Sequence, residues 1–161
     1  PGSFFPVGTT TVTCTATDVH QNTATCAFEV RVDDTEAPTI VCPPNVAQPT
    51  TPGACGRTLA YLGTPFEVAD NCQVSTYSAA SPGYFPVGET EVVWTVSDIH
   101  GNTGSCVQTV RIFDNQLPVV QCPAALETSL DEGSCEASNV AFAATASDNC
   151  GVVTLSYDHE P

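Results

Sequence analysis

The chain has 161 residues, of which 18 are acidic and only three are basic, so its formal net charge is −15 at pH 7. A surface this acidic repels nucleic-acid phosphates and anionic membranes, so neither class of partner is expected. No apolar run approaches the roughly 20 residues that a membrane-spanning helix needs, so no membrane insertion is expected either.

Residues 1–32 predict two antiparallel strands joined by the turn "DVHQN". Apolar residues and cysteines alternate with polar residues along both strands, and this period of two is typical of half-buried strands. The inward positions are Val12, Cys14 and Ala16 in the first strand, and Cys26, Phe28, Val30 and Val32 in the second.

The same pattern returns 80 residues later. "FPVGTTTVTCTATDVHQNTATCAFEVRVDDTEAPTIVCP" (5–43) aligns without a gap on "FPVGETEVVWTVSDIHGNTGSCVQTVRIFDNQLPVVQCP" (85–123). The inward positions of the second copy are Val92, Trp94 and Val96, followed by Cys106, Gln108, Val110 and Ile112. A repeat of this length, built of short strands and turns, predicts a small β-sandwich of immunoglobulin-like type.

Two cysteine motifs also recur: "GAC" at 53–55 matches "GSC" at 133–135, and "ADNC" at 69–72 matches "SDNC" at 147–150. We refer to the loops that carry them as the GxC loops and the DNC loops. The chain has nine cysteines and no Cys-x-x-Cys pair, which favours structural disulfides in an oxidising compartment over zinc or redox sites.

The motifs "PTIVCP", "GAC", "ADNC", "FPVGETEV" and "VSDIHGNTGSC" together resemble the hyalin repeat (HYR) domain family. The resemblance covers the whole chain and departs from the pattern at Cys14, where the other copy has Trp94. It implies an all-β fold of tandem immunoglobulin-like sandwiches, in a module of extracellular adhesion and matrix proteins that is not an enzyme. The sequence also lacks the nucleophile-elbow, phosphate-loop and HExxH motifs of common enzyme classes.

The repeat divides the chain into three segments. Residues 33–113 hold one complete repeat, residues 114–161 hold the first half of a second, and residues 1–32 hold the last strands of a repeat. The missing halves are expected from neighbouring repeats, head to tail. Three arrangements remain open: a stretch of one long covalent array, a discrete subunit that donates strands to an identical copy, or a shortened piece with frayed ends.

The resemblance also implies a disulfide pattern. In it the cysteine after the linker ("DDTEAP", 33–38, in the complete repeat) pairs with the cysteine of the last strand, and the GxC cysteine pairs with the DNC cysteine. The implied bonds are Cys42–Cys106, Cys55–Cys72, Cys135–Cys150, and Cys122 to Cys26 of the next copy. Cys14 takes the place of an inward tryptophan, so we expect a buried free thiol there.

Acidic residues recur in the linker, the DNC loop and the loop before the last strand. One set is Asp33, Asp34, Asp70, Asp98 and Asn102, and the other is Asp114, Asp148 and Asp18 of the next copy. These three loops share one pole of an immunoglobulin-like sandwich, so Asp34, Asp70 and Asp98 are expected to converge. Hard oxygen ligands suit calcium, and the linkers are similar to the calcium-binding linkers of cadherins.

The alternative to calcium is that the Asp and Asn side chains cap turns by accepting hydrogen bonds from their own backbone. His20 and His100 occupy equivalent loop positions. With no second histidine or thiolate expected nearby, we predict that both are solvated loop residues and not ligands of a transition metal.

The sequence therefore predicts an extracellular or cell-surface structural protein, a head-to-tail fibre or stalk of disulfide-stapled sandwiches rigidified by calcium. It would serve adhesion, a surface appendage or a matrix, with identical copies or adjacent repeats as partners, and its many Thr and Ser residues leave O-glycans open. The alternative is a glycan- or protein-binding adhesion module of a larger extracellular protein, which an exposed aromatic cluster on one face would favour.

Overall fold

The computed structural model describes residues 2–138 and 140–158. Within these residues the chain forms strands, turns and loops but no helix, and so nothing in them has the length and apolarity of a membrane-spanning helix. The prediction of an all-β protein is confirmed.

The strands are mostly short, as expected for a chain rich in Thr, Val, Pro and Gly. In chain order they are β1 (Gly8–Thr17), β2 (Thr23–Val32), β3 (Thr39–Val41), β4 (Val46–Pro49), β5 (Gly56–Thr58), β6 (Glu67–Ala69), β7 (Val74–Ala79), β8 (Tyr84–Pro86), β9 (Gly88–Asp98), β10 (Thr103–Phe113), β11 (Val119–Gln121) and β12 (Thr145–Ser147).

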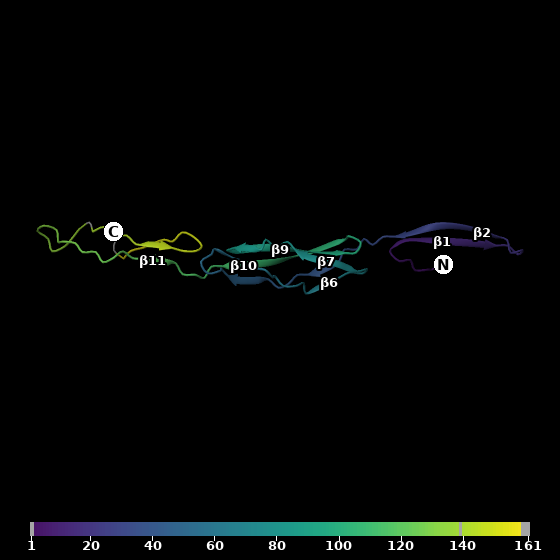
Figure 1. Cartoon of the computed structure of the whole chain (residues 1–161), viewed down its shortest axis with the longest axis horizontal. Coiled ribbons are helices and arrows are strands. Elements are labelled where there is room, and N and C mark those ends of the chain that lie inside the picture. Colours follow the sequence, from purple (N-terminus) through teal and green to yellow (C-terminus); the bar gives the residue numbers. More distant parts are fainter. Residues whose placement is uncertain (1, 139, 159–161) are drawn as a thin grey trace. The chain divides into compact units, whose positions relative to one another are not determined.

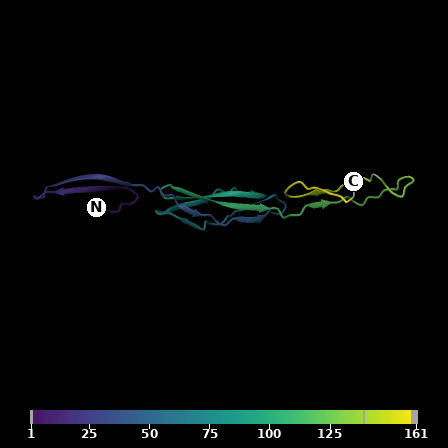
Figure 2. The same ribbon diagram turned by 180° about the vertical axis from the view of Figure 1, so that it is seen from behind.

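The complete repeat contains a four-stranded sheet in the order β4-β10-β9-β7 and two strand pairs, β3–β6 and β5–β8. The two long strands β9 and β10 lie side by side in both views (Figures 1 and 2). β4 joins β10 in parallel and β7 joins β9 antiparallel. This arrangement agrees with the predicted immunoglobulin-like sandwich.

Contacts divide the chain into two compact units that do not follow the sequence repeats. One unit is Pro1–Cys42 with Pro65–Ala79 and Trp94–Cys106, and the other is Pro43–Thr64 with Ala80–Val93 and Val107–Pro161. β9 and β10 each contribute residues to both units. The ends of the sequence repeats coincide with strand ends, since β2 ends at Val32 and β10 at Phe113.

The core residues follow the predicted alternation along β9 and β10. The buried side chains of these strands include Val92, Trp94, Val96, Gln108, Val110 and Ile112. Their neighbours Glu91, Val93 and Thr95 are exposed on the other face. Gln108 is tolerated inside because its Nε2 donates to the carbonyl oxygens of Pro44 at 2.7 Å and Leu62 at 2.9 Å, which satisfies a buried polar group.

The β1–β2 hairpin presents the same inward series with no strand over it in the described residues. Phe28 is 52% exposed, whereas its equivalent Gln108 is fully buried. Within this single chain the prediction that Cys14 is a buried thiol is wrong: Cys14 is exposed and lies opposite Cys26 in the strand register. The physical reason is that a hairpin without a facing sheet leaves both of its surfaces to solvent.

Candidate functional site

Three carboxylates converge within the first compact unit. Asp34 lies in the linker after β2, Asp70 follows β6 directly, and Asp98 is the last residue of β9. One carboxylate oxygen of each lies within 4.8 Å of the other two. The structure thus brings together the three aspartates that the sequence places at one pole, and we refer to them as the aspartate cluster.

Hydrogen bonds fix the Asp98 carboxylate. Its Oδ1 accepts from the backbone N–H groups of His100 at 2.8 Å and Asn102 at 2.9 Å, and its Oδ2 accepts from Asn102 Nδ2 at 2.7 Å. Desolvation raises the pKa of Asp98, but these bonds outweigh it and leave the pKa below its ordinary value. Asn102 Nδ2 also lies 3.3 Å from the carbonyl oxygen of Asp34, so Asn102 connects the linker to Asp98.

The Asp70 carboxylate is only half satisfied. Its Oδ2 accepts from the backbone N–H groups of Cys72 and Gln73, both at 2.9 Å. Its Oδ1 is buried and has no hydrogen-bond partner, which is true of no other buried side-chain oxygen or nitrogen in the described residues. A buried, unpaired carboxylate oxygen is costly. Together with the carboxylates of Asp34 and Asp98, the Asp70 carboxylate fits the ligand set of a hard cation such as calcium.

A thiol and an imidazole border the aspartate cluster. Asp34 Oδ2 lies 3.1 Å from His100 Nδ1, and the ligand atoms of Asp34, His100 and Cys72 lie within 4.8 Å of one another. Desolvation, a hydrogen bond to Asp34 and the surrounding carboxylates raise the pKa of the Cys72 thiol.

The prediction that His100 has no thiol nearby is therefore wrong. The turn after Asp70 brings Cys72 close to Asp34 of the linker. The only sequence signal for this proximity is that Cys follows Asp by two positions in both DNC motifs.

Asp33 does not join the aspartate cluster, although the sequence offers it as a ligand. Its side chain is exposed, and its Oδ1 accepts a hydrogen bond from Arg31 Nε at 2.8 Å. Successive side chains of an extended segment point to opposite sides, so a linker that directs Asp34 inward directs Asp33 outward.

The second predicted set is only partly assembled within the described residues. Asp114 and Asp148 line one depression of the second unit. The backbone N–H of Gln116, 3.1 Å from Asp114 Oδ1, is the main cause of a lowered pKa at Asp114. Asp148 Oδ1 accepts from the backbone N–H of Cys150 at 2.8 Å. No third carboxylate joins this pair among residues 2–138 and 140–158.

Asp18, the predicted third member, sits in a turn that repeats the turn of Asp98. Its Oδ1 accepts from the backbone N–H groups of His20 and Asn22, both at 2.8 Å, and its Oδ2 accepts from Asn22 Nδ2 at 2.8 Å. The side-chain bond from Asn22 is the main cause of a lowered pKa at Asp18. The turn therefore takes this form even on an exposed hairpin.

Two disulfides are formed in the described residues. Cys42 is bonded to Cys106, as the resemblance implies, with 5.8 Å between the Cα atoms. Cys55 is bonded to Cys150, with 4.6 Å between the Cα atoms. The free cysteines are all exposed: Cys14, Cys26, Cys72, Cys122 and Cys135.

The predicted bonds Cys55–Cys72 and Cys135–Cys150 are therefore wrong, because Cys55 and Cys150 are bonded to each other and leave Cys72 and Cys135 free. The reason lies in the contact between a GxC loop and the DNC loop of the following segment. Asn149 Nδ2 donates to the carbonyl oxygen of Ala54 at 3.0 Å, which places Cys150 against Cys55. The bond from Cys122 to Cys26 of the next copy stays a prediction.

Comparison with known proteins places these features in a family. The family model described as "HYR domain" matches residues 1–32 and 33–112. Hyalin of Strongylocentrotus purpuratus is 37% identical over 128 residues, covering 76% of this chain and 11% of that protein. Hyalin of Lytechinus variegatus is 32% identical over 163 residues, covering 96% of this chain and 31% of that protein.

A further relative is the sushi, von Willebrand factor type A, EGF and pentraxin domain-containing protein 1 of Rattus norvegicus, 33% identical over 66% of this chain and 3% of that protein. The chain thus spans less than a third of the two hyalins it matches. No solved structure matches it. On the match of its family model to both copies of the repeat, the chain belongs to the HYR domain family.

Proposed function

We propose that this chain is part of an extracellular structural array in which HYR domains follow one another head to tail and form an adhesive fibre or matrix element. The disulfide bonds and the two hyalins among its relatives support an extracellular, adhesion-type module. The acidic surface, with a net charge of −15, suits a cation-rich extracellular medium.

The observation that carries the head-to-tail arrangement is the uncovered inner face of the β1–β2 hairpin. In the complete repeat Trp94 is 5% exposed and Val96 fully buried, but the equivalent residues Cys14 and Ala16 are exposed. Because the same strand pattern is covered in one copy and bare in the other, we propose that residues 114–158 of a neighbouring HYR repeat cover the hairpin.

Self-association of the whole chain tests this proposal. We expect sedimentation velocity to show a series of oligomers that grows with concentration, and Phe28→Asp to leave a monomer because it puts a charge on the inner face. Ala27→Asp is the matched control, since Ala27 is exposed on the opposite face of the same strand. A monomer at every concentration in the parent chain, or equal effects of the two variants, would contradict the proposal.

We further propose that calcium binds the aspartate cluster and stiffens the linker at the start of the complete repeat. The orphaned Asp70 Oδ1 and the two neighbouring carboxylates support an oxygen-rich site. Bound calcium would fix the linker residue Asp34 to the ends of β6 and β9, because all three residues would share one ion.

Calcium is expected to raise the melting temperature of the chelator-treated protein and to give a measurable heat of binding in isothermal titration. At a free concentration of 100 times the dissociation constant, the gain in the free energy of unfolding would be about 2.7 kcal/mol. Asp70→Asn should abolish both responses, whereas Asp33→Asn should retain them because Asp33 lies outside the cluster. Equal melting temperatures with calcium and with chelator would refute the site.

A further inference from the structure

The disulfide between Cys55 and Cys150 joins two different repeats. Cys55 belongs to the GxC loop of the complete repeat, and Cys150 belongs to the DNC loop of the segment that follows it. Polar contacts join the two segments beside this bond, among them those from Asn149 Nδ2 to the carbonyl oxygen of Ala54, from Gly53 N to Gln116 Oε1, and from the Thr50 hydroxyl and Asn149 Nδ2 to Asp114. The bond is thus the centre of a junction between consecutive repeats.

The two GxC loops have the same backbone conformation, although only one is bonded. In the bonded loop (51–56) and the free loop (131–136), the N–H of the first residue donates to the carbonyl of the last at 2.9 Å. The central glycines, Gly53 and Gly133, both have φ of 77°, in the left-handed region that favours glycine. The thiol of the free loop is therefore carried by the same backbone framework as the bonded one.

The two DNC loops are also alike. The N–H of Cys72 donates to the Asp70 carboxylate at 2.9 Å, and the N–H of Cys150 donates to the Asp148 carboxylate at 2.8 Å. Cys150 is half-buried in its disulfide, whereas Cys72 is an exposed free thiol. What differs between the copies is whether a GxC loop faces the cysteine.

We infer that every DNC cysteine of this array bonds to the GxC cysteine of the preceding repeat, so that Cys72 accepts a GxC cysteine from the repeat before it and Cys135 accepts a DNC cysteine from the repeat after it. Between two copies in head-to-tail order, the bond runs from Cys135 of one copy to Cys72 of the next. This inference rests on the proposed order of the repeats, but not on calcium.

Formation of the bond follows ordinary thiol–disulfide exchange. One cysteine thiolate attacks a small-molecule disulfide such as oxidised glutathione, and the second thiolate then displaces the remaining glutathione from the mixed disulfide. One S–S bond forms between the repeats, one S–S bond of the oxidant breaks, and two glutathione thiols leave with the two protons of the cysteines. The two electrons lost by the cysteines reduce the oxidant.

The test uses two full-length chains fused end to end, so that the order of the repeats is imposed whether or not free chains associate. After equilibration in a glutathione redox buffer, peptide mapping by mass spectrometry under non-reducing conditions should find Cys135 of the first copy joined to Cys72 of the second. Each copy should also contain Cys55–Cys150. The single chain, mapped at a concentration where it sediments as oligomers, should give the same Cys135–Cys72 peptide between molecules.

Serine variants provide the controls. Cys135→Ser in the first copy should remove the mapped peptide and leave a free thiol at Cys72 of the second, whereas Cys14→Ser should leave the peptide in place. A fused protein with Cys55–Cys150 formed and both Cys135 and Cys72 still free, or with Cys72 joined to Cys55, would overturn the inference. Failure of the single chain to associate, with the fused protein correctly bonded, would instead count against the proposed assembly alone.

Discussion

Replacing both Cys42 and Cys106 by serine is expected to lower the free energy of unfolding by about 4 kcal/mol. The bond links the end of β3 to β10 across a sequence separation of 64 residues. Its main effect is to restrict the unfolded chain, and a loop of that length gives a loss of this size in the chain-entropy model. The free energy of unfolding of a globular domain is typically only about 5–15 kcal/mol, so the variant should unfold at a much lower urea concentration.

The double variant is used because a single substitution would leave a new thiol that could exchange with other disulfides. Cys14→Ser is the control: Cys14 is exposed and free, so its loss should change stability by no more than about 0.5 kcal/mol. Equilibrium unfolding in urea without reductant compares the three proteins. Indistinguishable midpoints for the double variant and the parent would show that this disulfide does not support the fold.

Phe85→Ala is expected to cost about 3–5 kcal/mol, because Phe85 is the largest fully buried side chain and its removal leaves a cavity. Phe85 lies in the middle of β8 and is registered with Arg57 of β5. Around it the strands are in close contact: a Cβ on Gly56 would overlap the Tyr84 ring and the Phe85 carbonyl oxygen. A site this tightly bounded by backbone has little freedom to collapse around the missing ring.

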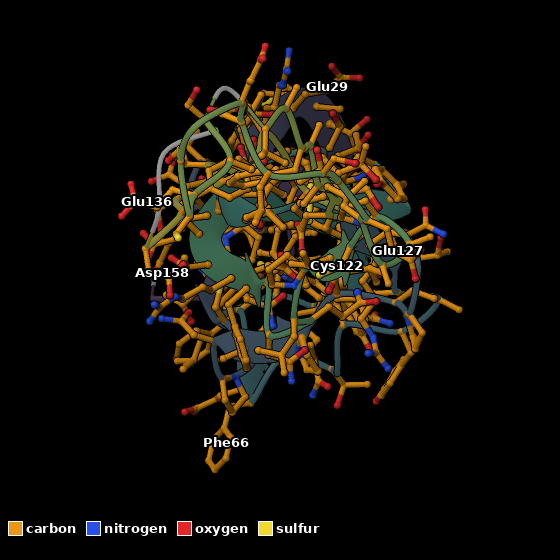
Figure 3. The ribbon with its side chains drawn as sticks, turned by 90° about the vertical axis from the view of Figure 1, so that its left-hand side faces the viewer. Glu29, Phe66, Cys122, Glu127, Glu136 and Asp158 are labelled. Atoms are coloured by element: carbon orange, nitrogen blue, oxygen red, sulfur yellow. A yellow bond between two sulfur atoms is a disulfide. The ribbon has the colours of Figure 1, made fainter. Side chains whose placement is uncertain are left out.

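Phe66→Ala is the matched control for this loss. The Phe66 side chain is 84% exposed and projects away from the ribbon in Figure 3, so its removal should change stability by about 0.5 kcal/mol or less. Thermal melting or urea unfolding of both variants measures the contrast. Similar losses at the two positions would mean that Phe85 does not anchor the core.

The fold could be predicted well because its signals are local and repeated. Alternation along β9 identifies Val92, Trp94 and Val96 as core residues without any knowledge of their partners, and the structure buries all three. Burial of the equivalent hairpin could not be predicted in the same way. The alternation of residues predicts that the face carrying Cys14 is an inner face. Whether that face is buried depends on strands from outside the hairpin.

The candidate site could also be predicted only in part. Convergence of Asp34, Asp70 and Asp98 follows from fold topology, since it needs only three loops at one pole. The partner of Cys55 could not be predicted from fold topology within one repeat. A cysteine motif shows where a thiol lies, but not which other loop packs against it. Within one repeat the analogy suggested Cys72, whereas the contact of Asn149 with Ala54 brings Cys150 from the next repeat instead.

The disulfide between Cys55 and Cys150 also determines how tension would travel along the chain. The bond spans a sequence separation of 95 residues, longer than one whole repeat. Once the chain is taut, a pulling force applied outside this loop follows the shorter covalent path across the Cys55–Cys150 bond. The enclosed residues, including β9 and β10, then stay slack, although Cys106 of β10 is itself bonded to Cys42 outside the loop. Roughly 320 Å of extended chain, at 3.4 Å per residue, is thereby protected from stretching. A fibre built this way would transmit tension through covalent bonds even where its β-sandwiches had unfolded.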